Sequence, residues 1–457
     1  MQIISKINGL KMEWLYLFFT LTIGTALVFI TPPNQVPDEL AHFFRAYQVS
    51  DGVFCGPHRE YQRNENEKVF FIYAEVPKSL WTIDMPNIGA QKNYYSLSST
   101  RDLLSLPLDA ENLDEPAISN TGTYSPLVYA PQALFIFFAK IFFGTVGAVF
   151  YAARLGAVFF TAICIFFAIK LLPEKKALII ILAFAPMFLY EMASCSADAV
   201  IYSISFLSFA YLLHLRKNTS KISNKELFFL ALSAIALGLS KQIYGTILLL
   251  YFLIPSEKFG NKKIFYLGGL ALIGVFLISA LGWMHFAKNG VNISPALSPE
   301  ADMTAQLNFM ISSPETFLSI CINSLFSYIK FWEKEFVGVL GWLSISLPIW
   351  FYTFYEVALL AAGLYGSLNL TLSQRALMIF SIIPIYLAVS VYFYTTWSPV
   401  GAPTFYGCQG RYFIPCAPMI LAAFSVFENN RFENFFILLV ALISSSLTFY
   451  KVIEHFY

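Results

Sequence analysis

Long apolar runs alternate with shorter polar segments along the whole chain. A transmembrane helix needs about 20 consecutive apolar residues, with roughly 17 to 25 as the usual range. Because lipid offers no partner to backbone polar groups, such runs cross a membrane as helices. The pattern predicts an all-α integral membrane protein with about 11 transmembrane helices. The predicted spans are 14–30, 149–171, 177–192, 197–215, 226–240, 243–254, 264–285, 348–368, 376–396, 412–427 and 433–450.

A long polar segment, 31–148, follows the first predicted span. Its first part is rich in Pro, Asn, Asp and Glu and is too long for a simple connection, so we expect a small folded unit. The apolar run 127–143 near its end is just long enough to span. We expect it instead to be a juxtamembrane helix, because the basic loops that follow it then all lie on the same side of the membrane as the N-terminus.

A second polar segment, 286–347, follows the seventh predicted span. Within it, Ser312-Ser313-Pro314-Glu315 is a typical helix start, with a serine cap, a proline at the first position and an acid in the first turn. We expect the helix that follows, to Trp332, to lie in the membrane interface. If residues 315–351 crossed the membrane twice, the count would rise to about 13. The predicted regions are 1–285, a seven-span catalytic module; 286–347, the second outer segment; and 348–457, the C-terminal transmembrane helices.

Basic residues set the expected orientation, since cytoplasmic loops carry an excess of Lys and Arg. Lys175-Lys176, the Arg216–Lys225 cluster and Lys258–Lys263 share one side in this topology. Lys6 and Lys11, before the first run, fall on that side too, and the run resembles an uncleaved signal anchor. We expect a multi-pass protein of the bacterial cytoplasmic (inner) membrane, with a cytoplasmic N-terminus and both long polar segments outside.

Composition agrees with a membrane protein and narrows its chemistry. The chain is 57% hydrophobic and 12% charged, whereas a soluble domain carries about 25% charged residues. A net charge of +1 suggests no nucleic-acid partner. The sequence has no Walker-type loop and no C-x-x-C pair, so neither nucleotide hydrolysis nor a structural zinc site is indicated. Cys55 and Cys408 share the outer side, as two free thiols or as a disulfide. No cofactor is indicated, although a divalent metal would be compatible with the acidic residues.

Candidate chemistry begins directly after the first span, at Pro37-Asp38-Glu39-Leu40-Ala41-His42. A helix can start after Pro37, with Asp38 and Glu39 in its first turn, where acidic side chains are favoured. One interpretation is a solvated helix N-terminus. The other is a catalytic carboxylate held at the membrane surface, where a lipid-linked substrate can reach it.

The predicted topology gathers further polar and aromatic residues at the same outer face. Acids and bases beside lipid suit a substrate with a membrane-embedded tail and a phosphate-linked head, because cations would bind the phosphate and a carboxylate would take a proton from an attacking hydroxyl. Besides Asp38 and Glu39 as catalytic groups, the candidate substrate-binding residues are His42, Arg45, Tyr124, Tyr129, Arg154, Asp198, Lys241, Tyr244, Trp397, Gln409, Arg411 and Tyr412.

Several of these residues also have purely structural interpretations. Lys241 can extend its ammonium to the interface. Asp198 can cap the helix that follows it. Arg411 can anchor a helix end. Arg154 is the exception, because a charge inside a span is costly and usually has a partner.

The order of these motifs resembles the GT-C superfamily of polyprenyl-phosphate-sugar glycosyltransferases. The opening Pro37-Asp38-Glu39 is similar to that of bacterial aminoarabinose transferases, in which these residues follow the first span. The whole chain resembles a broad prokaryotic family of multi-pass membrane proteins catalogued as a domain of unknown function. The matching pieces are Pro37-Asp38-Glu39-x-x-His42, Tyr124-Ser125-Pro126-Leu127-Val128-Tyr129, Ser194-x-Ser196-x-Asp198, Lys241-x-x-Tyr244, Gly338-x-x-Gly341-Trp342, Trp397-x-Pro399-x-Gly401 and Gln409-Gly410-Arg411-Tyr412.

The resemblance implies a GT-C-like bundle with large outer loops after spans one and seven. It implies inverting transfer of a sugar from a polyprenyl-phosphate carrier to an acceptor hydroxyl on a glycan or lipid. By match to the Pro-Asp-Glu pattern, Asp38 would be the base and Glu39 a neighbour that orients it. The chain departs from the family in two ways: a second acidic motif is not evident, and His42 stands where the aminoarabinose enzymes have an aromatic residue.

Two other functions fit the same pattern. A transporter or flippase of lipid-linked sugars usually shows internal repeats and charges near the membrane midplane, and no repeat is evident in this sequence. A polysaccharide polymerase or ligase would use two lipid-linked substrates and differs from the first function mainly in how many sugars it adds.

Overall fold

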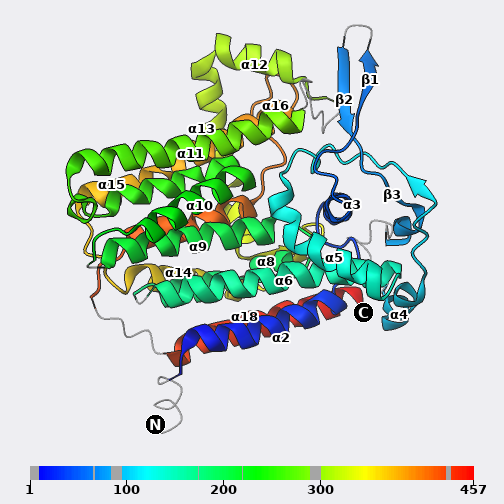
Figure 1. Ribbon diagram of the computed structural model, residues 1–457, viewed down its shortest axis with the longest axis horizontal. Helices are drawn as coiled ribbons and strands as arrows, with labels where there is room; N and C mark the ends of the chain where they lie inside the picture. Colours follow the sequence, from blue (N-terminus) through cyan, green and yellow to red (C-terminus); the bar gives the residue numbers. More distant parts are fainter. Residues whose placement is uncertain are drawn as a thin grey trace.

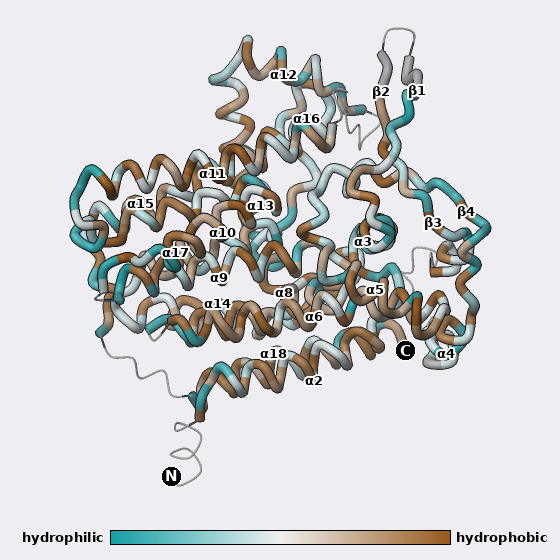
Figure 2. Tube along the Cα trace, in the orientation of Figure 1, coloured by the Kyte–Doolittle hydropathy of each residue, from teal (hydrophilic) through white to brown (hydrophobic). Residues whose placement is uncertain are grey.

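A computed structural model describes residues 10–64, 67–83, 95–172, 174–218, 220–288, 300–428 and 434–457. Most of these residues lie in helices, and the long helices run roughly alongside one another (Figure 1). Hydrophobic residues cover these helices, whereas hydrophilic residues gather toward their ends and in the connections (Figure 2). The architecture confirms an all-α membrane protein.

Six helices in the described part of the chain are long and apolar enough to cross a membrane. Each coincides with a predicted span. They are α2 (Met12–Ile30), α6 (Val146–Leu171), α9 (Asp198–Lys217), α11 (Lys262–Lys288), the consecutive pair α15 (Leu372–Phe380) and α16 (Ile382–Thr396), and α18 (Asn434–Phe456).

The other predicted spans fall on shorter or broken helices. The run 177–192 is not one helix, because Pro186 cannot donate a backbone hydrogen bond and starts a new helix. The run 243–254 is a 3₁₀ helix, whose larger rise of about 2.0 Å per residue lets 12 residues cover ~24 Å instead of ~18 Å. The elements concerned are α7 (Lys176–Ala183), α8 (Pro186–Met192), α10 (Asn224–Ser240), η4 (Gln242–Leu253), α14 (Ile349–Leu364), η6 (Gly410–Cys416) and α17 (Ala417–Ala423).

The first polar segment is folded and lies at one end of the bundle (Figure 1). Its strands form two small antiparallel pairs, and the buried side chains of Ile72, Val76 and Ile118 contribute to its core. Its elements are α3 (Glu39–Ser50), β1 (His58–Asn64), β2 (Glu67–Ile72), β3 (Val76–Pro77), η1 (Lys78–Ile83), α4 (Leu97–Ser105) and β4 (Leu113–Asp114).

The apolar run 127–143 forms η3 (Pro126–Tyr129) and α5 (Ala130–Phe142). The 13 residues of α5 extend only ~20 Å, less than the ~30 Å hydrocarbon core. It packs closely on α6, where a Cβ added at Gly156 would lie 2.5 Å from the Pro131 carbonyl oxygen. This length agrees with the predicted juxtamembrane helix.

The second polar segment contains α12 (Met303–Ser312), α13 (Pro314–Gly338), β5 (Val339–Leu340) and β6 (Ile345–Ser346). The predicted start of α13 is confirmed, with Ser313 at the N-cap and Pro314 at the first position. The helix runs on past Trp332, because Glu335 and Val337 pack into the protein.

Cations at the other end of the bundle bind helix C-termini, whose last carbonyls have no partner within the helix. Lys175 Nζ donates to the carbonyls of Gly363 and Tyr365 at the end of α14. Lys258 Nζ donates to the Leu215 carbonyl near the end of α9, and Arg375 donates to Ala423. Lys175, Lys258 and Arg375 thus lie at the same end of the helices, whereas Lys6 is outside the described residues.

Candidate functional site

Asp38 stands at the start of α3 in a strained backbone conformation. Its φ of 63° lies in the left-handed region, which few non-glycine residues adopt and which recurs at functional sites. The side chain forms no capping hydrogen bond with the helix. Asn120 Nδ2 donates to Asp38 Oδ1 at 3.3 Å, and the side chain is 45% exposed. The carboxylate thus forms no capping bond with its own helix and is accessible.

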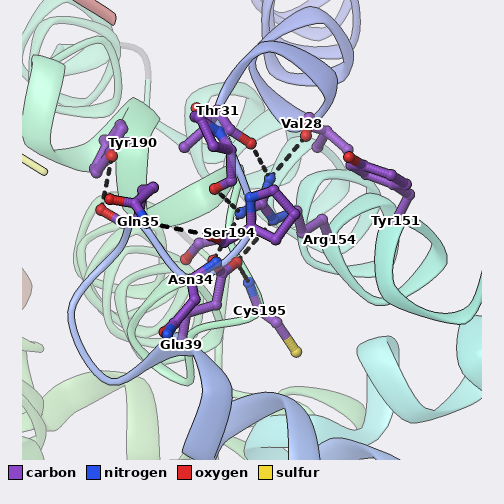
Figure 3. A network of polar contacts seen from close by, with 12 residues as sticks. Val28, Thr31, Asn34, Gln35, Glu39, Tyr151, Arg154, Tyr190, Ser194 and Cys195 are labelled. Atoms are coloured by element: carbon purple, nitrogen blue, oxygen red, sulfur yellow. Dashed lines mark hydrogen bonds and ion pairs between the residues drawn. The ribbon is translucent and has the colours of Figure 1, made fainter. Parts of the chain in front are cut away.

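Glu39 and Arg154 form a fully buried ion pair between α3 and α6 (Figure 3). Arg154 Nε donates to Glu39 Oε1 at 2.7 Å, and Nη2 donates to Oε2 at 2.6 Å. The backbone N–H of Cys195 and of Asn34 also donate to Glu39. Both carboxylate oxygens are therefore fixed by three separate parts of the chain. We name this pair and its partners the Arg154 clamp.

The remaining N–H groups of Arg154 bind the chain directly after α2. Nη1 donates to the carbonyls of Val28 and Thr31, and Nη2 donates to Pro32. An arginine has five N–H donors, and the clamp uses all five. All five donors of Arg154 are thus bound within the protein, which favours a positioning role for Arg154 over the expected substrate-binding role. Glu39 likewise acts by holding the start of α3, which carries Asp38.

A second buried arginine, Arg411, lies in η6 and is surrounded by acids from three elements. Its Nη1 contacts Glu191 Oε1 of α8. Its Nε is 3.7 Å from Asp198 Oδ2, and its Nη2 is 3.9 Å from Asp38 Oδ2. The last two distances are ion pairs but too long for direct hydrogen bonds. We name Arg411, Asp38, Glu191 and Asp198 the Arg411 cluster.

Lys241 supplies a second cation beside this cluster, between α10 and η4. Its Nζ lies 4.3 Å from the centre of the Tyr412 ring, a cation–π contact. Among the described residues, no carboxylate lies within salt-bridge distance of it. Tyr244, three residues further on, is buried and donates its hydroxyl to the Tyr412 carbonyl at 2.7 Å, which ties η4 to η6.

His42 reaches the same region one turn after Asp38. Its Nδ1 is 2.7 Å from the Tyr129 hydroxyl, and its ring stacks on Tyr124 with centroids 6.2 Å apart. Burial lowers the pKa of His42 to about 4, although Asp38 and Asp198 nearby act to raise it. The imidazole is thus neutral at pH 7, which makes it a hydrogen-bonding group and not a phosphate-binding cation.

The structure also shows the contacts of the other predicted site residues. Buried Arg45 donates to the carbonyls of Val53 and Tyr124, so it connects two parts of the first polar segment. Trp397 is 38% exposed, and its ring packs on Gly407. Gln409 precedes Gly410, whose N–H donates to buried Glu335 at 2.8 Å. Cys55 and Cys408 are free thiols.

Three residues of the site escaped the sequence reasoning: Glu191, Asn120 and Glu335. Glu191 had a usable signal, because it is the acid within the apolar run 177–192 and a charge in such a run needs a partner. Asn120 and Glu335 had none, since each is brought in by a long-range contact.

The arrangement combines an accessible carboxylate, two cations and a neutral imidazole at one end of the helices. It can accept a proton and hold an anionic group in one place. Within the described residues, no group of three or more His, Cys, Asp or Glu is placed to hold a metal ion.

Comparison with known proteins identifies a family. No curated protein and no solved structure matches this chain. Residues 21–420 match the model of a family described as a predicted membrane protein, DUF2142. This match covers most of the chain and includes every residue of the site, so the protein belongs to the DUF2142 family of membrane proteins.

Proposed function

We propose that this protein is an integral-membrane inverting glycosyltransferase of GT-C type. It moves a sugar from a polyprenyl-phosphate carrier to an acceptor hydroxyl on the extracytoplasmic face. The observation that carries the proposal is the accessible Asp38 carboxylate, which lies 3.9 Å from Arg411 Nη2, with Lys241 beside the Arg411 cluster. A base and a phosphate-binding pair are what such a transfer requires.

Asp38 is the general base of the proposed reaction. Its carboxylate takes the proton of the acceptor hydroxyl as that oxygen attacks the anomeric carbon of the sugar. The bond from the anomeric carbon to the phosphate oxygen breaks, and its electron pair leaves with the polyprenyl phosphate. Attack from the face opposite the leaving group inverts the anomeric centre.

Lys241 and Arg411 would stabilise the departing phosphate, where negative charge develops. Their contributions differ, because Arg411 already has three carboxylates around it. Lys241 has only the Tyr412 ring as its described partner, so we assign it the closest contact with phosphate. The Arg154 clamp would keep Asp38 at a fixed distance from both cations.

The test is sugar transfer by the purified full chain in reconstituted membranes. Wild type and Asp38→Asn meet a panel of polyprenyl-phosphate sugars, with and without a chelator of divalent ions. Asp51→Asn is the matched control, because Asp51 ends the same helix and its carboxylate is exposed and paired with Lys140. We expect wild type and Asp51→Asn to transfer sugar and Asp38→Asn to be impaired.

Full activity of Asp38→Asn would refute the assignment of the base. Failure of wild type with every donor, with folding verified, would reject the proposed donor class. The chelator arm reports metal dependence independently of these outcomes.

A transporter of lipid-linked sugars is the second candidate. The observation that favours it is the break between α7 and α8, since transporters bind substrates at discontinuous helices. Substrate movement across liposomes without a new glycosidic bond would select this function.

A further inference from the structure

A pocket of about 520 Å³ lies at the end of the bundle opposite Asp38. It falls within the range of small-molecule sites, roughly 300–1,000 Å³. The C-terminal end of α9, the end of η4, the connection after it and the first turns of α11 and α15 form its walls. Its charged lining residues are Arg216, Lys262 and Glu257. Neither the proposed transfer reaction nor the predicted motifs involve this pocket.

The two cations of the pocket have spare donors. Arg216 donates one hydrogen bond, from Nη2 to the Asn369 carbonyl at 3.2 Å, and its side chain is half-buried. Lys262 is exposed at the start of α11, and its ammonium has no polar partner among the described residues. The contrast with Lys175, Lys258 and Arg375 is informative, because those neighbouring cations bind helix carbonyls. Arg216 and Lys262 are thus available to an anion.

The pocket opens onto an apolar surface. Phe252 and Tyr266 line it and are 36% and 58% exposed. Tyr266 begins a stripe on α11 whose members recur at helical spacing and face outward. Only 22% of the apolar window of α11 is buried inside the protein, so this face is available to lipid. The exposed residues of the stripe are Tyr266, Leu270, Ile273, Leu277 and Leu281.

We propose that this pocket binds an anionic phospholipid of the leaflet at this end of the helices. The phosphate lies between Arg216 and Lys262, and an acyl chain follows the stripe on α11. Glu257, the acid of the lining, accepts a hydrogen bond from a headgroup hydroxyl. Phosphatidylglycerol, with a phosphate and two hydroxyls, is the simplest lipid that satisfies all three side chains.

Native mass spectrometry of the full chain, titrated with phosphatidylglycerol or phosphatidylcholine, tests the proposal. The variant Arg216→Gln/Lys262→Gln is compared with Lys217→Gln/Lys263→Gln, which loses the same charge from adjacent positions outside the pocket. We expect the pocket variant to bind phosphatidylglycerol roughly 30-fold less tightly and the control to bind like wild type.

The single variant Lys262→Gln is tested as well, in case the double variant does not fold. Lys262 is exposed, and its substitution breaks no described contact. It is expected to weaken binding about fivefold. Equal weakening by both double variants would overturn the proposal, since binding would then follow overall charge. Displacement of the lipid by soluble glycerol phosphate at equal concentration would overturn it too, because the acyl chain would then contribute nothing.

Discussion

The two buried arginines near Asp38 differ in how many of their N–H groups are hydrogen-bonded within the protein. Arg154 donates all five N–H groups, and it faces one carboxylate. Arg411 faces three carboxylates, and its Nε has no hydrogen-bond partner among the described residues. A saturated network holds one geometry, whereas an unsaturated one can accept a ligand. The clamp is thus suited to support and the cluster to chemistry, although they share the turn at Asp38-Glu39.

Removal of the clamp cation is expected to have the largest effect on stability. Arg154→Met leaves Glu39 buried without a counter-ion, which lowers the free energy of unfolding by about 3–5 kcal/mol. Thermal unfolding of purified protein measures the loss. Glu39→Gln/Arg154→Met should recover part of it, because no lone buried charge remains. A single variant as stable as wild type would show that the clamp is not structural.

Substitutions of the neighbouring carboxylates Asp38 and Glu39 should affect activity and stability to different degrees. Asp38→Asn is expected to lower the transfer rate by about 10²–10⁴, the usual contribution of a general base. Its unfolding midpoint should stay near that of wild type, because Asp38 is half-exposed. Glu39→Gln should instead lower the unfolding midpoint more strongly than the transfer rate. Thermal unfolding and transfer rates of both variants are measured in parallel. Equal changes in both quantities for the two variants would contradict the prediction.

Lys241→Gln is expected to act on donor binding. Loss of one charge-assisted hydrogen bond to phosphate, about 1.5–3 kcal/mol, raises the donor KM by roughly 10- to 100-fold. The fold should be retained, since the described contact of Lys241 is with the Tyr412 ring. Steady-state kinetics over a range of donor concentrations provide the measurement. A change confined to kcat would instead place Lys241 at the reacting centre only.

His42 should contribute the smallest, pH-dependent effect. Its pKa of about 4 lies below the ordinary value near 6.5, so between these pH values His42 is protonated in the unfolded state but neutral in the native state. Stability is therefore complete above pH 6.5 and falls as the pH drops toward 4. His42→Gln should flatten this part of the stability curve. Unfolding midpoints at pH 5 and pH 7 test it, and an unchanged slope would contradict it.

Local patterns in the sequence predicted most of the helices because membrane-length apolar runs leave the backbone few choices. Met12–Ile30 and Val146–Leu171 differ from prediction by only a few residues. The exceptions have local causes that hydropathy does not register. Pro186 splits one run, and Gln242–Leu253 adopts a 3₁₀ helix with a different rise per residue.

The sequence allowed us to predict which residues belong to the site but not which of them contact each other. Asp38, Asp198, Lys241 and Arg411 were expected at one face, and the structure brings them close to one another. Their individual roles were not predictable, because these roles depend on contacts between residues far apart in the chain. Glu39 and Arg154 are 115 positions apart, and Glu191 and Arg411 are 220 apart. Periodicity carries no information about such partners.

A hydrogen bond between the first polar segment and α18 has a consequence for synthesis of the chain. The Tyr95 N–H donates to the Phe456 carbonyl, and the Tyr457 hydroxyl donates to Ile30 at the end of α2. At 5–20 residues per second, Phe456 follows Tyr95 from the ribosome after about 20 to 70 s. The Arg154 clamp can close early in that interval, whereas Arg411 and α18 arrive late. The contacts between the first polar segment and α18 therefore form only at the end of synthesis.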